Sequence, residues 1–270
     1  MQLSDVYGIT DIDVLAFGKL HLGDGLFVII TISIFLSVIQ VIFRKLIGEK
    51  LLEECHEVSG YIFAVVGTFY AVLIGLFVFD SQNQFEERRE GLLNESVAMQ
   101  ELYKYAQEMP KFYSEPLKVH IRGYVERVLT YEWQAMAMGH EDEGAQSELA
   151  VINKIVRDIS IENDKQNTLY DKMNDLLYDV SKERAMRIAI AEVGIPRLEW
   201  AVLLAGGIST LTFGFFFSMK NRFLQIVSDL LFAAIIGLNL FIIAQYRSPY
   251  EGEIVISKEP FERTLRYLRN

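Results

Sequence analysis

Four long apolar stretches interrupt the polar sequence of this 270-residue chain. They cover residues 25–43, 61–79, 200–219 and 223–246. Each approaches the roughly 20 residues that an α-helix needs to cross about 30 Å of hydrocarbon. Buried helices of a large soluble protein are the weaker explanation, because nearly uncharged runs of this length are rare in soluble cores. We therefore predict four transmembrane helices.

Between residues 81 and 196 the pattern becomes that of a water-facing domain, with 21 acidic against 14 basic residues. Phe85, Leu92, Met99 and Ala106 recur every seven residues, which is typical of a helix packed along one seam. Residues 61–109 contain no proline. The second span is therefore predicted to continue as one helix of about 49 residues, or about 73 Å.

Further helices are predicted beyond Pro110. Ser114-Glu-Pro116 indicates an N-cap followed by a proline in the first turn. The helix that follows carries an apolar face and ends at Gly139. That face consists of Leu117, Ile121, Tyr124, Val128, Tyr131 and Ala135. Two more helices are expected, around residues 149–159 and 169–180, and we expect no sheet.

The predicted fold is an all-α integral membrane protein, with four transmembrane helices and a soluble helical bundle inserted between spans 2 and 3. The expected organisation is an N-terminal segment (1–24), spans 1 and 2 (25–80), the soluble domain (81–196), spans 3 and 4 (197–246) and a C-terminal tail (247–270).

Composition and charge exclude several functions. The net charge of -10 argues against a nucleic-acid partner, which would require a basic surface. Cys55 is the only cysteine, so no intramolecular disulfide can form. The acidic residues and His56 within 53–57 follow a span end, where a solvated face is expected rather than a metal site. No phosphate-binding loop or nucleophile elbow occurs, so we expect no metal, cofactor, catalytic residue or enzymatic activity.

Small residues recur every four positions on two spans, which lets helices approach closely in lipid. They are Gly67, Ala71 and Gly75 on the second span, and Gly206, Thr210 and Gly214 on the third. The far face of the second span contacts either lipid or, in a ring of subunits, the pore. The pore-lining candidates are Val65, Phe69, Leu73 and Leu76, with Asp80 as an acidic ring at the pore mouth.

Two polar residues of the fourth span are further candidates. An acid inside a membrane is costly and is a functional candidate by default, which applies to Asp229. The alternative is an ordinary hydrated position near the interface, helped by Gln225 one turn away. Asn239 is the only residue that hints at a midplane transport site.

Orientation rests on the basic residues that flank the spans. The short loops hold Arg44, Lys45, Lys50, Lys220 and Arg222, whereas the domain side holds about twice as many basic residues. We favour a multi-pass protein of the plasma or inner membrane with the soluble domain and both termini in the cytosol.

Short motifs across nearly the whole chain beyond residue 25 resemble those of the bestrophin-like membrane proteins (the DUF4239 class). The tail SPYEGEIVISKEPF is similar to the Pro-aromatic-Gly element of that family, carried here by Pro249, Tyr250 and Gly252. The segment from Glu95 to Tyr103 looks like the helix after the second span. Arg184-Ala-Met-Arg187 with Pro196 looks like the approach to the third.

This resemblance implies an ion channel related to the bestrophins. It would be a homo-oligomer in the lipid bilayer, with a pentamer favoured, and would conduct monovalent ions through a pore lined by the second span. Gly75 lies at the glycine that matches the aromatic neck of bestrophins. Bestrophins bind calcium through a dense acidic run after the Pro-aromatic-Gly element, whereas Glu251, Glu253 and Glu259 are dispersed, so calcium gating is not expected.

Two other functions stay open from the sequence. A membrane-anchored signalling or scaffold protein would use the helical domain to bind a partner. A transporter would need broken helices and midplane polar sites. Ion selectivity also stays open, because the wider family leans towards chloride whereas Asp80 and the acidic domain would concentrate cations.

Overall fold

The computed structural model describes residues 17–137, 140–192, 197–216 and 221–269. The described residues are predominantly helical and contain no strand, which confirms the prediction of an all-α protein. The helices are α2 (Leu22–Ile47), α3 (Glu49–Glu108), α4 (Lys111–Arg127), the π-helix η2 (Val128–Glu132), α5 (Trp133–Ala137), α6 (Glu143–Arg157), α7 (Asp164–Glu192), α8 (Arg197–Phe216), α9 (Arg222–Tyr246) and α10 (Glu259–Arg269).

Four of these helices, α2, α3, α8 and α9, are long and apolar enough to cross a membrane, which confirms the four predicted spans. The second span does continue into a long helix, since α3 extends over 60 residues. It is longer than predicted because the polar residues before Tyr61 are helical too. Only Gly48, with φ of 88°, separates α2 from α3. Glycine adopts this left-handed φ without strain and so ends α2.

The chain forms two compact units. The first comprises residues 1–84 and 194–255 and contains α2, α8, α9 and the first part of α3. The second comprises residues 85–193 and 256–270 and contains the rest of α3, α4 to α7 and α10. The tail after α9 is therefore divided between the units, with its last helix in the second.

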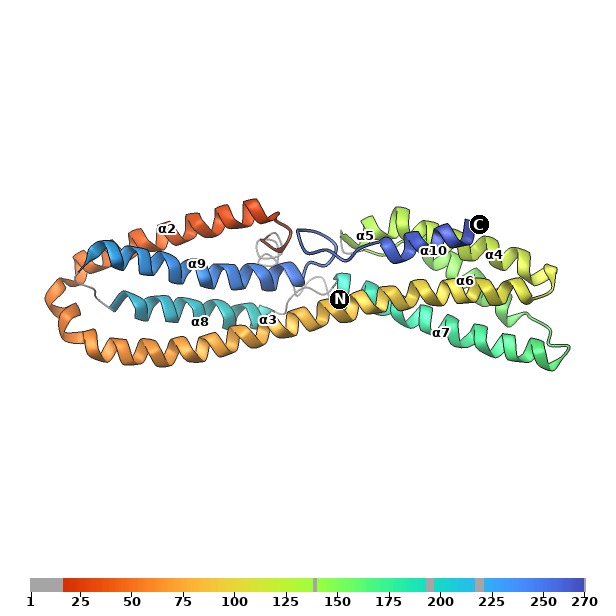
Figure 1. Ribbon diagram of the computed structural model, residues 1–270, viewed down its shortest axis with the longest axis horizontal. Coiled ribbons are helices and arrows are strands. Elements are labelled where there is room, and N and C mark those ends of the chain that lie inside the picture. The colour runs from red at the N-terminus through yellow and green to blue at the C-terminus, as the bar shows by residue number, and fades with distance from the viewer. Residues whose placement is uncertain (1–16, 138–139, 193–196, 217–220, 270) are drawn as a thin grey trace, which may run out of the picture. The chain divides into compact units, whose positions relative to one another are not determined.

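In the first unit α2 packs chiefly on α9, and α8 also packs on α9 (Figure 1). Two glycines allow the close approach of α2 and α9. A Cβ atom at Gly237 would lie 2.9 Å from Cγ2 of Ile29, and one at Gly25 would overlap the ring of Phe241. These contacts also fix the antiparallel register, in which Gly25 faces Phe241 and Ile29 faces Gly237.

The second unit has a conventional helical core. The seven-residue seam of α3 is confirmed, because Phe85, Leu92, Met99 and Ala106 are all buried. α4 packs on α6, and α10 packs on α4 (Figure 1). The amphipathic α10 buries one face, which consists of Phe261, Thr264 and Leu268. Burial of this apolar face, rather than local propensity, holds so short a helix in place.

The predicted start of α4 was wrong. Pro110, not Ser114, is the N-cap, and the backbone N–H of Ser114 already donates to the Pro110 carbonyl at 3.0 Å. Pro116 consequently lies inside α4 rather than in its first turn. Ser114 is itself buried, so its side chain is committed to packing rather than to a solvent-facing cap.

The predicted apolar face of this helix is confirmed only as far as Val128. Leu117, Ile121, Tyr124 and Val128 are buried, but Tyr131 is 58% exposed. The π-helix η2, which contains Tyr131, causes the difference, because its wider turn shifts the side chains from Tyr131 onward around the helix axis. Glu132, Trp133 and Met136 therefore point inward and replace Tyr131 in the core.

Candidate functional site

The second span exposes an apolar face of the kind that was predicted to line a pore. Val65 is 56% exposed, Phe69 74% and Leu76 64%. Val72 and Phe79 are exposed as well, and the five positions follow the alternating spacing of four and three residues that keeps side chains on one helix face. These exposed fractions mean that the rest of the described chain covers little of this face.

Leu73 differs from the other pore-lining candidates. It is half-buried and packs against the small core of Tyr70, Ile74, Leu203 and Ile243. The continuous exposed face therefore passes through Val72 rather than Leu73.

Tyr70 anchors the opposite face of α3 to α8. Its hydroxyl donates to the Leu203 carbonyl at 3.2 Å. A Cβ atom at Gly206 would lie 2.6 Å from the ring of Tyr70, and one at Gly207 would lie 3.0 Å from its hydroxyl oxygen. Gly206 and Gly207 of the third span thus leave the space that the Tyr70 side chain occupies. By contrast, Cβ atoms at Gly67 and Gly75 would meet no atom of the described residues within 4 Å.

Asp80 closes the second span but is engaged in an ion pair. Arg247, after the last turn of α9, donates to the Asp80 carboxylate at 2.9 Å and to the Ser81 hydroxyl at 3.3 Å. Gln84 also donates to Asp80, at 2.7 Å. The carboxylate of Glu199 lies 3.4 Å from the same guanidinium. The acidic charge at this end of the span is therefore partly compensated.

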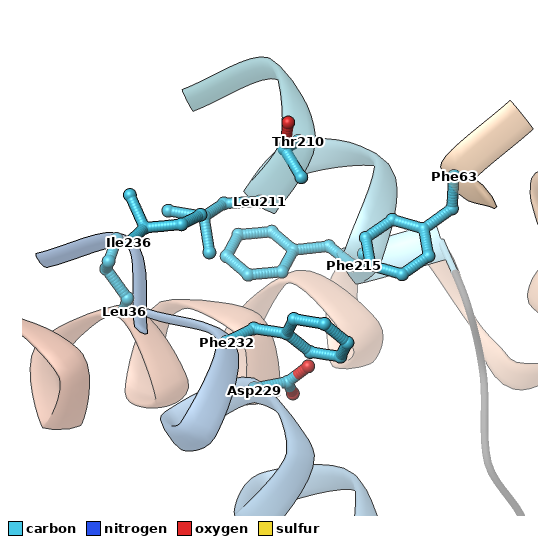
Figure 2. Close-up of a pocket in the computed structure, with 9 residues that line it drawn as sticks. Leu36, Phe63, Thr210, Leu211, Phe215, Asp229, Phe232 and Ile236 are labelled. Carbon is cyan, nitrogen blue, oxygen red and sulfur yellow. The ribbon is translucent and has the colours of Figure 1, made fainter. Parts of the chain in front are cut away.

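The two polar candidates of α9 have different surroundings. Asp229 is buried, accepts hydrogen bonds from Nε2 of Gln225 at 3.1 and 3.3 Å, and lines a small cavity with aromatic walls (Figure 2). Asn239 is half-buried and donates to the Ile235 carbonyl one turn back on its own helix, at 2.8 Å. Both side chains thus form hydrogen bonds within α9, and Asp229 in addition lines the cavity.

The tail motif forms a tight turn against the end of α9. Pro249 is buried, and Gly252 has a φ of 100° that favours glycine. A Cβ atom at Gly252 would lie 2.6 Å from the carbonyl oxygen of Gly18 and 2.8 Å from Oε1 of Gln245. The glycine of the motif is thus required both by its backbone conformation and by its neighbours.

Gln245 holds this turn to the segment before α2. Its Oε1 accepts the backbone N–H groups of Glu253 and Ile254 at 2.9 and 3.2 Å, and its Nε2 donates to the Leu20 carbonyl at 2.7 Å. The side chain is buried. One amide therefore ties three segments of the first unit together.

The tail glutamates are engaged as well. Glu251 pairs with Lys19 at 2.6 Å, and Glu253 accepts the first backbone N–H of α2 at 3.4 Å. Glu259 pairs with Arg263 on α10. The described residues hold no group of three or more His, Cys, Asp or Glu side chains placed to bind a metal ion. The side chains at 53–57 lie outside the description.

The second unit contains a buried charge network that the sequence did not predict. Arg187 donates to both oxygens of Glu95, at 2.8 and 2.9 Å, and to Glu132 at 2.9 Å. Arg184 donates to Glu132 at 2.5 Å and to Gln146. All four ionic side chains are at most 5% exposed. Together they link α3, η2 and α7.

Tyr124 completes the network by donating to Glu95 at 2.6 Å. Burial, together with the negative charge of Glu95, raises the pKa of the Tyr124 hydroxyl well above its ordinary value. Burial alone would lower the pKa of Arg187, but the carboxylates of Glu95 and Glu132 raise it well above its usual range. Both groups therefore stay in their ordinary protonation states at neutral pH.

Sequence reasoning singled out Glu95, Arg184 and Arg187 only as parts of short motifs. Their pairing was missed because 92 residues separate Glu95 from Arg187. A signal existed, since Arg184 and Arg187 lie three residues apart and so share one face of a helix. Two arginines on the inner face of a bundle require carboxylate partners.

A family model described as the bestrophin-like domain matches residues 30–261. A search of curated proteins found no match.

Several solved crystal structures resemble the chain. One is a variant of a bacterial bestrophin homologue from Klebsiella pneumoniae, with a TM-score of 0.67 and 12% identity over 91% of this chain and 99% of that one. The structure of the Klebsiella homologue solved with zinc phasing gives 0.66 and 12% identity over 90% and 96%. A variant described only as a membrane protein gives 0.67 and 11% identity over 90% and 97%. At these identities the structures show a shared fold.

Proposed function

Because this chain belongs to the bestrophin-like family, whose members are ion channels rather than enzymes, we propose that it forms a homo-oligomeric channel with the second span lining the pore. The observation that carries the proposal is the exposed apolar face of α3, which the rest of the described chain leaves largely uncovered. In a ring of subunits such a face surrounds the axis. A narrow apolar constriction of this kind can gate by dewetting.

The proposed lining consists of Val65, Phe69, Val72, Leu76 and Phe79. Leu73, which the sequence favoured, is left out because it packs against the core that joins α3 to α8. Gly67 and Gly75 have free space around them, so they can accept a neighbouring helix of another subunit. A pentamer is the favoured assembly.

We propose that the channel conducts monovalent ions. Its preference for cations or anions would be set near the end of the second span. Asp80 would form an acidic ring there and favour cations. Arg247 reduces this effect, because its guanidinium lies 2.9 Å from the carboxylate. The balance between these two side chains is thus the proposed determinant of ion preference.

We propose that the second unit and both termini face the cytosol, in the plasma or inner membrane. This orientation places Cys55 outside. Labelling of that native cysteine by a membrane-impermeant maleimide in intact cells supports the orientation. Labelling that occurs only after the cells are opened would place Cys55 in the cytosol and would contradict this orientation.

The channel is tested by reconstituting the purified protein into liposomes and measuring salt flux. Replacing Phe69 by Ala widens the proposed constriction, so basal flux is expected to rise several-fold. Phe27→Ala on α2 is the matched control, because Phe27 is 71% exposed on a different span and should leave flux unchanged. Equal effects of both substitutions would contradict the proposed lining.

The oligomeric state provides an independent test. A particle with a central axis is expected in nanodiscs, whereas a monomer or dimer would overturn the channel. A folded oligomer that conducts no ions would favour the alternative of a membrane-anchored signalling or scaffold protein, in which the helical domain binds a partner.

A further inference from the structure

The π-helix η2 lies between α4 and α5 and makes one wider turn in an otherwise α-helical segment of the second unit. The backbone N–H of Trp133 donates to the Val128 carbonyl five residues back, whereas an α-helix bonds residues that are four apart. Such single turns are rare and are frequently found at functional sites. The proposed channel assigns no role to this turn.

The sequence of the segment favours a different register. Val128, Tyr131 and Ala135 continue the apolar face of α4 at α-helical spacing. In an uninterrupted α-helix Trp133 would point away from the core, because five residues make one full turn and about 140° more. In the structure Trp133 is 7% exposed and Tyr131 is 58% exposed. The π turn thus exchanges one aromatic side chain for the other.

Glu132 holds the segment in the observed register. Its Oε1 accepts from Arg184 at 2.5 Å, and its Oε2 accepts from Arg187 at 2.9 Å. A buried carboxylate requires such partners, because burial without them forfeits its hydration. The charge pairs therefore favour the π register, whereas the apolar spacing that includes Tyr131 favours the α register.

Both arginines have a second carboxylate within reach if Glu132 turns away. Arg187 donates to both oxygens of Glu95, at 2.8 and 2.9 Å. The carboxylate of Glu141 lies 3.7 Å from the Arg184 guanidinium and is 51% exposed, so it is free to move closer. Neither arginine is then left buried without an acid. The second register consequently avoids the cost of an uncompensated buried charge.

The C-terminal tail contacts the same segment. Nζ of Lys258 lies 5.9 Å from the centroid of the Trp133 ring, which is within the range of a cation–π interaction. α10, which follows Lys258, packs on η2. Rotation of Trp133 away from the core breaks the contact with Lys258. The register of η2 and the attachment of the tail are therefore linked.

We propose that η2 is a conformational switch with two registers. The π register buries Glu132 and Trp133 and holds the tail through Lys258. The α register differs by one residue, buries Tyr131 and releases Lys258. All of these side chains belong to the second unit, so the switch does not depend on whether the protein conducts ions.

The fluorescence of Trp133 reports the register in purified full-length protein with Trp200→Phe as the background. Glu132→Gln removes the charge that binds both arginines and should shift the segment to the α register. We expect a red-shifted emission and a several-fold larger quenching constant with acrylamide. Helix content by circular dichroism should not change, and trypsin should cleave several-fold faster after Lys258.

Deletion of the exposed Thr130 provides the matched control. A π turn holds one residue more than an α turn, so the shortened chain can place Glu132, Trp133 and Met136 inward within an ordinary α-helix. Combined with Glu132→Gln, the deletion should keep Trp133 shielded and Lys258 protected. Equal quenching of Glu132→Gln with and without the deletion would overturn the switch, because the substitution would then only loosen the bundle.

Unchanged quenching in Glu132→Gln would also overturn the proposal. If that variant fails to fold, Tyr131→Lys decides the matter. Its charged side chain stays in solvent in the π register but is buried in the α register, so acrylamide quenching of Trp133 should fall below that of the parent protein. Tyr178→Lys, at a 70% exposed position on α7, should leave quenching unchanged. Equal quenching in the parent and in both lysine variants would contradict a second register.

Discussion

Glu95 on α3 and Arg187 on α7 form a buried two-pronged ion pair, with 2.8 Å between Oε2 and Nε and 2.9 Å between Oε1 and Nη2. Glu95 is completely buried and Arg187 is 5% exposed. The pair therefore holds together two helices that are distant in sequence. A buried pair of this kind specifies one arrangement of the helices more than it adds net stability.

Removing one partner should be strongly destabilising. Glu95→Gln leaves the Arg187 guanidinium undercompensated, and we expect the free energy of unfolding to fall by about 3–5 kcal/mol. The chain has two tryptophans, so in a Trp200→Phe background the fluorescence of Trp133 reports on the second unit alone. Denaturant titration in this background measures the change.

Glu101→Gln is the control, because Glu101 pairs with Lys104 on the surface of the same helix. Surface pairs contribute about 0–1 kcal/mol. A loss as small for Glu95→Gln as for this control would mean that the buried pair does not hold the bundle together.

The Tyr124 hydroxyl makes the stability of the second unit sensitive to alkali. Its pKa is raised in the folded state by burial and by the Glu95 carboxylate. The folded state therefore retains a proton that the unfolded chain loses above about pH 10. Stability should be unaffected below this pH and should fall above it, by up to about 1.4 kcal/mol per pH unit.

Tyr124→Phe removes this titration and one hydrogen bond. The variant should be less stable than wild type at pH 8, by about 1–3 kcal/mol, and should show a shallower decline between pH 10 and 11. Tyr178→Phe, at a 70% exposed position on α7, is the control for tyrosine ionisation in general. Parallel declines in all three proteins would contradict the role of Tyr124.

The glycines of the second and third spans should respond differently to substitution. Gly206→Ala places a methyl group against the Tyr70 ring, where a Cβ atom would lie only 2.6 Å away. We expect a loss of about 1–3 kcal/mol from overpacking. Gly75→Ala meets no neighbour among the described residues and should leave the melting temperature of the protomer unchanged or slightly higher.

Melting temperatures of both variants in detergent test this contrast. If Gly75→Ala instead dissociates an oligomer without unfolding the protomer, Gly75 contacts another subunit. Equal loss of folded protein in both variants would mean that the second span packs differently from the arrangement around Tyr70.

Gln245→Leu should release the tail turn. The substitution removes an acceptor for Glu253 and Ile254 and a donor to Leu20. We expect faster tryptic cleavage at Lys258, by about tenfold, since each lost buried hydrogen bond raises the population of the open turn. Lys19→Gln breaks only the exposed pair with Glu251 and should change the cleavage rate little. Unchanged cleavage in Gln245→Leu would show that other contacts hold the turn.

Arg247→Gln should shift ion preference if the proposed channel conducts. The substitution exposes the Asp80 charge that the guanidinium compensates at 2.9 Å. Reversal potentials in planar bilayers should move towards greater cation preference, whereas Asp80→Asn should move them the other way. Arg269→Gln, which breaks a surface pair with Glu126, is the control. An unchanged potential in both Asp80→Asn and Arg247→Gln would exclude this pair as the determinant of selectivity.

Features that depend on neighbouring residues along the chain were predicted well. The four spans follow from local hydropathy, and the long α3 follows from an unbroken heptad seam without proline. The start of α4 was missed because Ser114 and Pro116 form a plausible cap, but Pro110 offers one earlier. The tail glycine was recognised by resemblance, and its contacts with Gly18 and Gln245 supply the physical reason.

The candidate sites were predicted less evenly. Asp229 was singled out, but the cavity that it lines also involves Leu36, Phe63 and Phe215, which lie on helices far apart in sequence. Leu73 and Val72 are neighbours, and both are apolar. Only packing against Ile74, Leu203 and Ile243 shows which of the two is exposed.

Local pattern alone determined that this chain is helical, crosses the membrane and inserts a polar bundle, because hydropathy and helical periodicity are properties of adjacent residues. The tertiary structure decided which polar groups meet. The π-turn of η2 rotates Glu132 into the core, where Arg184 and Arg187 bind it. Such pairings arise only when distant segments fold together, since burial then requires each charge to find a partner.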